Sequence, residues 1–541
     1  MGRIKGWGRV PLLGALLMSL FIMITLVFFS HHFPYSSDSA RYIEQAREML
    51  LGNGAIEAPF GLNGEGKAPS ALFPVGFPVF LYLIGLLGID PKDSAIYVGR
   101  VSATLLPLLV FIGFKRILHA NFAVMLAILV ALSPSVLANA PLALTDIPAL
   151  FIALAAAALL FNTASVLPFV MAGMLVACGY GVRNAHLALI VTTILYFILC
   201  YVIFKPERAR TIKLSAAFFG GVVAIALPLL VRNYFVFGNL SPYKMGQSTI
   251  GLVENVRTYI NTITFDVTAL QDLSEYIAWS IPGLAIILLI ALTYVYLATL
   301  AWRKMANNEK KVFLFCALYV AIGSAVVIVA RTRYQWGEGI NIRHTLQYTP
   351  FALAMLFLAS KHFIAVVGPF SWRRVYSSGL VPLLMMALIV THVYHAITYF
   401  AAREEGNEAM LAYNTGEAFL CNRRQDVLLV SNWAFVFRMQ CLSPVRHLGH
   451  VNSQRDVWRK DVANEIKVYD TLMDGVRDID VSFPEREIVA GFLPGRHGVE
   501  ASDLPVPESD ATMLHNMGWT IYKNDKNALI IGRQRKSPGR G

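Results

Sequence analysis

Two acidic residues in this chain stand where a carboxylate could take up a proton at a membrane surface. Asp38 follows the first long apolar run by a few residues, and Asp146 lies in the polar break LALTDIPAL between two later runs. An alcohol is a poor nucleophile at neutral pH, so a carboxylate within hydrogen-bond reach has to accept its proton. We predict that Asp38 is this general base and that Asp146 is a second, orienting carboxylate. The alternative is that Asp38 only caps the helix that begins beside it, because Asp is a good N-cap.

Several cations follow other apolar runs and are candidates for holding a phosphate. Charge-assisted hydrogen bonds from Arg or Lys stabilise a phosphate that departs as an anion. The predicted phosphate-binding residues are Arg343, His344, Arg232, Arg183 and Lys67, with Arg343 first because it enters a late apolar run from its polar side. Tyr42 and His186 are predicted to contact the substrate or acceptor. The competing interpretation of each Arg is an anchor at the end of a helix, where its side chain reaches the polar interface.

Composition assigns the chain to a protein class. Of its 541 residues, 56% are hydrophobic and only 15% are charged, which is typical of a polytopic membrane protein with some aqueous mass attached. The net charge of +12 does not indicate a nucleic-acid partner, because the basic residues cluster at the ends of apolar runs. The predicted fold class is therefore mostly α, a bundle of membrane-spanning helices.

The apolar runs and the charges between them predict a topology. The runs cover approximately residues 11–30, 72–88, 98–118, 121–139, 146–162, 167–182, 187–204, 213–231, 279–302, 312–330, 346–360 and 378–400. Lys and Arg are densest in the connections near residues 115, 205–213, 303–311 and 361–374, which the positive-inside rule places in the cytoplasm with the N-terminus.

The N-terminus and Lys115 are both predicted to be cytoplasmic, so only one span fits between residue 31 and Lys115. The run 98–118 is that span, and 72–88 therefore does not cross the membrane. Its Pro and Gly residues suit a juxtamembrane or re-entrant segment. We predict about 11 spans, with 13 as the alternative. Residues 31–97 form a long external loop with juxtamembrane helices, and 233–278 form a second one. The predicted location is the cell inner membrane, with the site and the C-terminal region on the periplasmic face.

The tail after residue 400 differs from the rest of the chain. Residues 401–536 contain frequent charges and the strand-like segments DVLLVSN, REIVAGF and WTIYKNDKNALIIG, which predict a small extracytoplasmic α/β domain. Residues 537–541 are predicted to be disordered. Cys421 and Cys441 are the two cysteines outside the apolar runs. They form a disulfide if the fold brings them within bonding distance, or else stay a free thiol and a buried helix residue.

Several short motifs, in this order, give the chain a resemblance to a known family. Asp38 is followed by Ser-Ala-Arg-Tyr, a Pro-rich stretch runs from Pro69 to Pro78, TDIP surrounds Asp146, and Pro228 precedes Arg-Asn at 232–233. This pattern resembles the GT-C membrane glycosyltransferases, among them the lipid A aminoarabinose transferases and the protein O-mannosyltransferases. The resemblance covers residues 1–235 well and 236–400 loosely. It implies that 1–400 is a GT-C-like transmembrane catalytic domain.

The resemblance also implies a reaction. Such enzymes transfer a sugar, with inversion, from a polyprenyl-phosphate donor to a hydroxyl acceptor on a glycolipid, polysaccharide or protein at the outer face of the membrane. The chain departs from members with an Asp-Glu pair at the first site, since Ser39 follows Asp38, and from those with two aspartates in the second loop. We therefore predict no cofactor and no metal site, although a divalent metal remains open. A secondary transporter and an O-antigen ligase or polymerase are the alternative functions.

Overall fold

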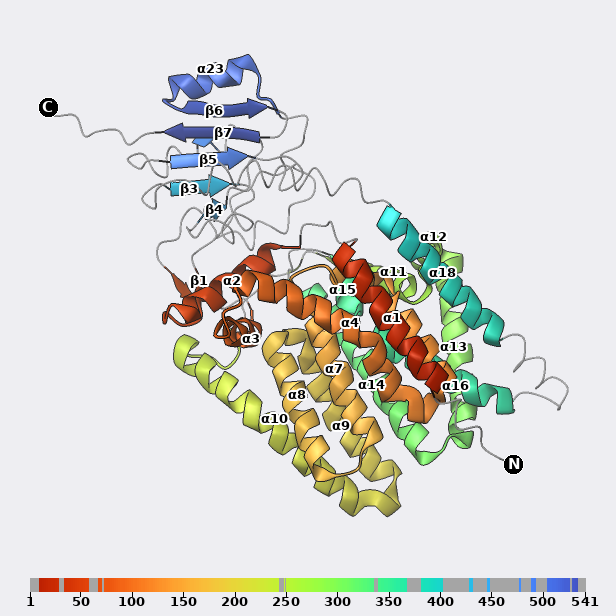
Figure 1. Ribbon diagram of the computed structural model, residues 1–541. Helices are drawn as coiled ribbons and strands as arrows, with labels where there is room; N and C mark the ends of the chain where they lie inside the picture. The colour runs from red at the N-terminus through yellow and green to blue at the C-terminus, as the bar shows by residue number, and fades with distance from the viewer. Residues whose placement is uncertain are drawn as a thin grey trace.

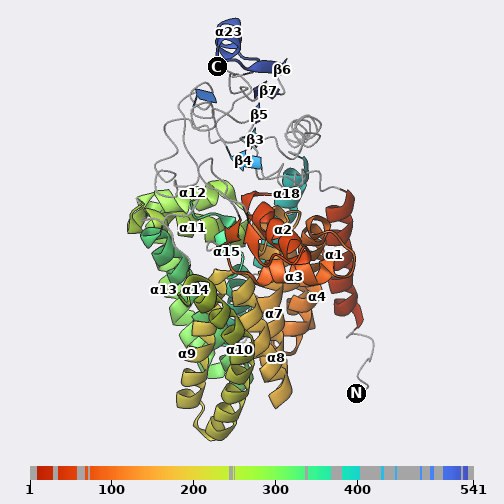
Figure 2. The same cartoon turned by 90° about the vertical axis from the view of Figure 1, so that its left-hand side faces the viewer.

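The structure, a computed structural model, is a bundle of long helices with a small β-sheet beyond one end (Figures 1 and 2). The residues that it describes are 9–28, 34–57, 67–70, 73–242, 248, 250–334, 339–366, 381–401, 428–431, 445–447, 476–477, 488–492, 504–525 and 528–533. The predicted tail at 537–541 and both Cys421 and Cys441 lie outside these residues. The disulfide between them therefore stays a prediction.

Each apolar run except 72–88 and 121–139 coincides with one helix of the bundle. These helices are α1 (Arg9–Phe28), α4 (Pro91–Leu118), α7 (Asp146–Asn162), α8 (Val166–Val182), α9 (Leu187–Ile203), α10 (Arg208–Phe237), α13 (Ile281–Lys304), α14 (Asn307–Arg333), α16 (Thr349–Val366) and α18 (Val381–Ala401), and α5 (Ala120–Ala131) forms the first part of the run 121–139. The run 121–139 is not one helix, because the chain turns at Ser133 and Pro134 begins the separate helix α6 (Pro134–Asn139). The predicted mostly α helical bundle is confirmed.

Length and composition make four of the described helices candidates to cross a membrane, namely α4, α14 and the segments 184–203 and 205–237. Six further apolar helices are shorter, among them α5, α7 and α8. The number of spans therefore stays a prediction.

Local sequence explains where long helices begin. Asp90 caps α4 by accepting a hydrogen bond from the backbone N–H of Lys92 at 2.7 Å, and Pro91 occupies the first turn. Ser280 caps α13 in the same way, through the N–H of Gly283 at 2.9 Å.

Glycines set the closest packing between two helices. A Cβ atom built on Gly173 of α8 would lie 2.0 Å from the carbonyl oxygen of Phe218 in α10, and one on Gly221 of α10 would lie 2.1 Å from that of Val170. The two backbones therefore pack directly against each other, as small residues allow in membrane bundles.

Polar contacts at one end of the bundle tie together helix ends that carry many basic residues. Lys361 of α16 contacts Glu309 of α14 at 2.5 Å and the carbonyl of Ile117 in α4 at 2.8 Å. Lys311 of α14 contacts Glu207, just before α10, at 2.5 Å. The connections predicted to be cytoplasmic therefore gather at one end.

Shorter helices, of which α3 is apolar and the others amphipathic, cover the opposite end (Figure 2). They are α2 (Ser37–Leu50), α3 (Gly76–Gly85), α11 (Leu252–Thr268) and α12 (Gln271–Trp279), and a two-stranded sheet of β1 (Ile56–Glu57) and β2 (Ala68–Pro69) adjoins α2. A helix of 10 residues such as α3 is about 15 Å long, half of what the hydrocarbon core needs. This length fits the juxtamembrane segment predicted for 72–88.

The C-terminal residues form a five-stranded sheet beyond the end that carries α2, α11 and α12 (Figures 1 and 2). Its strand order is β4 (Val445–His447), β3 (Leu428–Ser431), β5 (Ile488–Phe492), β7 (Ala528–Arg533) and β6 (Thr520–Asp525). Strands β4, β3 and β5 are parallel, whereas β6 and β7 form the predicted hairpin. Helix α23 (Glu508–Asn516) packs on this sheet, with the fully buried Trp519 and Leu514 in its core.

Cysteine labelling tests the predicted orientation. Leu51 is 71% exposed after α2, and Asn307 is exposed at the start of α14 at the other end. In a protein whose native cysteines are replaced, we expect Leu51→Cys to react with an impermeant maleimide from the periplasm, and Asn307→Cys only after the membrane is opened. Labelling of both from the same side would contradict the predicted topology.

Candidate functional site

Asp38 lies in the first turn of α2, but Ser36 caps this helix. The Ser36 hydroxyl accepts a hydrogen bond from the backbone N–H of Ser39, and the Ser39 hydroxyl accepts one from the N–H of Ser36 at 3.0 Å. This reciprocal pair is a capping box. The alternative prediction that Asp38 caps the helix is therefore wrong. Its carboxylate is left available for other contacts.

Arg343 joins the two predicted carboxylates. One guanidinium nitrogen, Nη2, lies 3.1 Å from Oδ2 of Asp38 and 3.2 Å from Oδ2 of Asp146, and Nε lies 3.4 Å from the other oxygen of Asp146. Arg343 belongs to the short helix α15 (Ile342–Thr345), which the Asn341 side chain caps by accepting from the N–H of Arg343 at 3.0 Å. Arg343 thus contacts Asp38, which lies more than 300 positions earlier in the chain, and Asp146 at the same time.

The two carboxylates have different surroundings. The Asp146 side chain is fully buried at the start of α7, where it pairs with Arg183 as well as with Arg343. The Asp38 side chain is 24% exposed. Two guanidinium groups compensate the buried charge of Asp146, as a charge removed from water requires. Asp38 is therefore the more accessible of the two carboxylates, and Asp146 is the one paired with two arginines.

His186 and Gln347 form a short hydrogen-bonded chain that ends at the backbone of Asp146. His186 is fully buried, and its Nε2 lies 3.2 Å from the side-chain oxygen of Gln347. The Gln347 amide donates to the backbone carbonyl of Asp146 at 3.0 Å. His186, the predicted acceptor contact, is therefore buried behind Asp146, which it contacts through Gln347. Gln347 was missed from the sequence, because a lone Gln beside an apolar run gives no signal of its own.

Tyr42 lies one helical turn after Asp38 and is 3% exposed. Its ring packs edge-on against Phe73 and Phe77, with centroids 5.2 and 5.3 Å away. Burial and the charge of Asp38 raise the pKa of Tyr42, so its hydroxyl keeps its proton. Tyr42, the predicted substrate contact, is therefore buried next to Asp38 and packed between aromatic rings.

His344 is adjacent to Arg343 in α15. Its Nδ1 accepts a hydrogen bond from the N–H of Asn341 at 3.1 Å, which leaves the proton on Nε2. Desolvation and the nearby guanidinium groups of Arg183 and Arg343 lower the pKa of His344 to about 3. The ring is therefore neutral near pH 7. It therefore adds no positive charge to the site.

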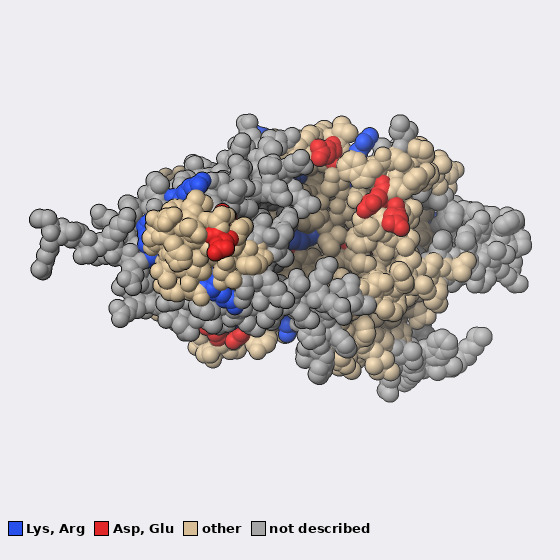
Figure 3. All heavy atoms as spheres, turned by 90° about the horizontal axis from the view of Figure 1, so that it is seen from above, with Lys and Arg blue, Asp and Glu red and all other residues tan. Residues whose placement is uncertain are grey.

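Two further predicted phosphate ligands lie apart from this cluster. Lys67 contacts the buried Glu48 of α2 at 2.5 Å, in the region of β1 and β2. Arg232, near the end of α10, donates to the side chain of Asn233 at 3.1 Å and lies over the ring of Phe237. The structure thus brings together Asp38, Asp146, Arg183, Arg343 and His344, which we call the carboxylate–arginine cluster. Figure 3 looks onto this end of the molecule, where basic and acidic side chains are both visible.

A further buried carboxylate, Asp266 of α11, was also missed from the sequence. It accepts hydrogen bonds from the backbone N–H and the hydroxyl of Ser135, both at 2.8 Å, and from the hydroxyl of Thr349. These bonds fix α11 to α6 and α16. Burial nevertheless raises the pKa of Asp266 to about 6.

This pKa predicts a pH dependence of stability. The unfolded chain releases the Asp266 proton near pH 3.8, but the folded protein retains it up to about pH 6. The retained proton contributes about 2–3 kcal/mol to the free energy of unfolding. This contribution is fully present below pH 3.8 and is lost as the pH rises through 6. We expect the wild-type melting temperature to fall between pH 4 and pH 7 relative to that of Asp266→Asn. Asp272→Asn, which removes an exposed carboxylate of α12, is the control. Equal pH dependence in all three proteins would contradict the prediction.

No group of three or more His, Cys, Asp or Glu side chains with the arrangement of a metal site occurs among the described residues. Cys178, Cys200 and Cys316 are free thiols within the apolar helices α8, α9 and α14.

Comparisons with solved structures place this geometry in a known fold. No protein-family model matches the sequence, and no curated protein matches it significantly. ArnT from Cupriavidus metallidurans bound to undecaprenyl phosphate is similar in structure, with a TM-score of 0.57, 11% sequence identity and 98% of both chains covered. Its apo form gives a TM-score of 0.56 at 11% identity, again over 98% of both chains. The oligosaccharyltransferase AglB from Archaeoglobus fulgidus, in complex with an inhibitory peptide and a dolichol-phosphate, gives 0.52 at 12% identity, over 90% of this chain and 69% of that one.

These likenesses extend over nearly the whole length of the chain, C-terminal region included. They confirm the resemblance in fold that the short motifs around Asp38 and Asp146 predict. The chain is thus a polytopic membrane protein with the GT-C fold.

Proposed function

We propose that the chain is an inverting membrane glycosyltransferase that moves a sugar from a polyprenyl-phosphate donor to a hydroxyl acceptor. The observation that carries this proposal is the contact of one Arg343 nitrogen with both Asp38 and Asp146. It unites a reachable base and a guanidinium in one site on the GT-C fold. The bound undecaprenyl phosphate of ArnT and the dolichol-phosphate of AglB support a lipid-phosphate donor.

In this mechanism Asp38 acts as the general base. The acceptor hydroxyl donates a hydrogen bond to the partly exposed carboxylate and attacks the anomeric carbon while Asp38 takes its proton. The bond from the anomeric carbon to the phosphate oxygen breaks, and the lipid phosphate leaves as an anion. Attack opposite the leaving group inverts the configuration at the anomeric carbon.

The arginines act on the leaving group. The side chains of Arg343 and Arg183 are 23% and 16% exposed, so a phosphate can reach both. Each can donate charge-assisted hydrogen bonds to it, and these strengthen as negative charge develops on the departing oxygen. Asp146, which stays ionised between them, fixes their positions. His344 adjoins Arg343 on the same short helix and adds no further charge.

The location of the site completes the proposal. The carboxylate–arginine cluster and the C-terminal sheet lie at the end of the bundle opposite the basic connections around Lys115 and Lys311. The positive-inside rule supports a periplasmic site in the inner membrane, where a lipid-borne donor can meet a glycolipid, polysaccharide or protein acceptor.

A transfer assay tests the function. Vesicles enriched in the protein are supplied with radiolabelled polyprenyl-phosphate sugars, one pentose, one hexose and one amino sugar at a time. We expect label to move into a membrane or polymer acceptor fraction with one of them, and undecaprenyl phosphate to inhibit the transfer. Uptake of a free solute into sealed vesicles without any sugar transfer would instead support a secondary transporter.

A further inference from the structure

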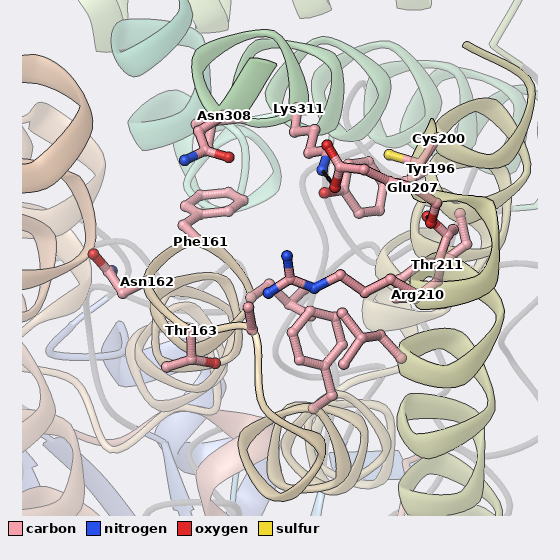
Figure 4. A pocket seen from close by; sticks show the side chains of 16 residues that line it. Phe161, Asn162, Thr163, Tyr196, Cys200, Glu207, Arg210, Thr211, Asn308 and Lys311 are labelled. Carbon is pink, nitrogen blue, oxygen red and sulfur yellow. Dashed lines mark hydrogen bonds and ion pairs between the residues drawn. The ribbon is translucent and has the colours of Figure 1, made fainter. Parts of the chain in front are cut away.

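A cavity of about 270 Å³ lies at the end of the bundle opposite the carboxylate–arginine cluster. It is bounded by the last turn of α7, the end of α9, the start of α10 and the start of α14 (Figure 4). Nothing in the proposed transfer reaction uses this cavity, since its lining shares no residue with the cluster around Asp38.

The cavity holds one cation without a charged partner among the described side chains. Arg210 of α10 lines it and makes no hydrogen bond or ion pair with the described part of the chain. Figure 4 shows its guanidinium extending across the opening, away from α10. The other lining cation, Lys311, is neutralised by Glu207 at 2.5 Å. The net charge offered to a ligand is therefore the planar, bidentate donor of Arg210.

The rest of the cavity lining has a polar part and an apolar part. Asn308 provides an amide, whereas Thr163 and Thr211 provide hydroxyl oxygens as acceptors, because both hydroxyls donate to backbone carbonyls of their own segments. Aromatic side chains form the apolar part, among them Phe161 and the largely buried Tyr196. A ligand that fills this space needs an anionic group for the guanidinium, hydroxyls or ester oxygens for the polar rim, and a carbon skeleton against the rings.

The surroundings of the cavity indicate how such a ligand arrives. The ends of the helices around it carry exposed apolar side chains, with Leu167 of α8 68% exposed, Val202 of α9 53% and Ile212 of α10 56%. Exposed Lys205 and Lys213 lie on the same connection and helix as Arg210. A basic rim next to a lipid-facing apolar surface attracts the head groups of acidic lipids. A free inorganic anion would leave the aromatic part of the cavity unused.

We propose that this cavity binds the phosphodiester head group of an acidic membrane lipid, with Arg210 as the phosphate ligand. The glycerol part of the head group contacts Asn308 and the threonine hydroxyls, and the acyl chains run along the exposed apolar side chains of Leu167 and Ile212. This lipid site lies on the face predicted to be cytoplasmic, distinct from the proposed donor site at Asp38.

Lipid titration of the full-length protein tests the proposal. The protein is purified in a neutral detergent, and phosphatidylglycerol or phosphatidylcholine is added while bound lipid is counted by native mass spectrometry. We expect saturable binding of phosphatidylglycerol and much weaker binding of phosphatidylcholine. Arg210→Gln should weaken the binding of phosphatidylglycerol by about tenfold.

Matched variants separate the cavity from general attraction. Lys213→Gln removes the same charge three residues later on α10, outside the lining, and should weaken the binding far less than Arg210→Gln does. Asn308→Asp adds a negative charge inside the cavity and should weaken binding as Arg210→Gln does. Melting temperatures of these exposed-site variants should match that of the wild type.

The outcomes decide the proposal. Equal losses in Arg210→Gln and Lys213→Gln, or equal binding of both lipids, would overturn it. Competition by millimolar inorganic phosphate that Arg210→Gln abolishes would support a phosphate site. If inorganic phosphate raised the melting temperature in an Arg210-dependent way while phosphatidylglycerol did not bind, the lipid assignment would be wrong.

Discussion

Asp38→Asn should leave the protein folded in the membrane and lower sugar transfer by roughly 10²–10⁴-fold, the usual contribution of a general base. The amide has nearly the shape of the carboxylate and its oxygen can still accept from Arg343, which lies 3.1 Å away. It cannot accept the proton of the acceptor hydroxyl. The loss should appear in kcat, while the KM for the lipid-phosphate donor changes little. Transfer rates in vesicles at matched protein levels provide the measurement.

The capping box supplies the control for this experiment. Ser36→Ala removes the hydroxyl that accepts from Ser39 and should destabilise α2 by about 1 kcal/mol. It leaves the Asp38 carboxylate in place, so transfer at a permissive temperature should stay close to that of the wild type. Near-normal turnover in Asp38→Asn would refute the catalytic role. An equal loss in Ser36→Ala would assign the effect of both variants to the helix instead of the proton.

The sequence predicts the bundle well because apolar length is a strong physical signal. A helix buried in hydrocarbon satisfies its own backbone, so each long apolar run has essentially one structure available. Among the runs predicted to span the membrane, the exception is 121–139, where Pro134 removes a backbone donor and a new helix begins. Parity and charge bias also predict that Asp146, Arg183 and Arg343 approach Asp38, since all four connections leave the bundle at one end.

Side-chain partners were harder to predict. Ser36 and Asp38 are both good N-caps, and only the backbone at Ser36 shows which of them is used. Lys67 lies on the correct side of the bundle, but the nearby Glu48 provides a closer anion. Asp266 looks like an exposed residue of an amphipathic helix, because its partners Ser135 and Thr349 are more than 80 residues away. Such partners depend on how loops return to the bundle, which local patterns do not encode.

Arg343→Ala should lower kcat/KM for the lipid-phosphate donor by roughly 10–100-fold, since a charge-assisted hydrogen bond is worth about 1.5–3 kcal/mol. The variant removes the nitrogen shared by Asp38 and Asp146, and Asp146 would keep Arg183 as its cation. A fully buried carboxylate that keeps only one of its two guanidinium partners destabilises the folded state, so the melting temperature should fall as well. The activity therefore has to be measured per folded protein.

Arg343→Lys separates the catalytic effect from the structural one. The ammonium restores a charge beside Asp146 but cannot donate from a planar fork to two carboxylates and a phosphate at once. We expect the melting temperature to recover largely while kcat/KM recovers only in part. Arg232→Ala, which changes a cation placed apart from the cluster, should leave the response to the donor unchanged. If Arg232→Ala impaired donor use and Arg343→Ala did not, the phosphate would bind near the end of α10, and Arg343 would serve only to hold the two carboxylates together.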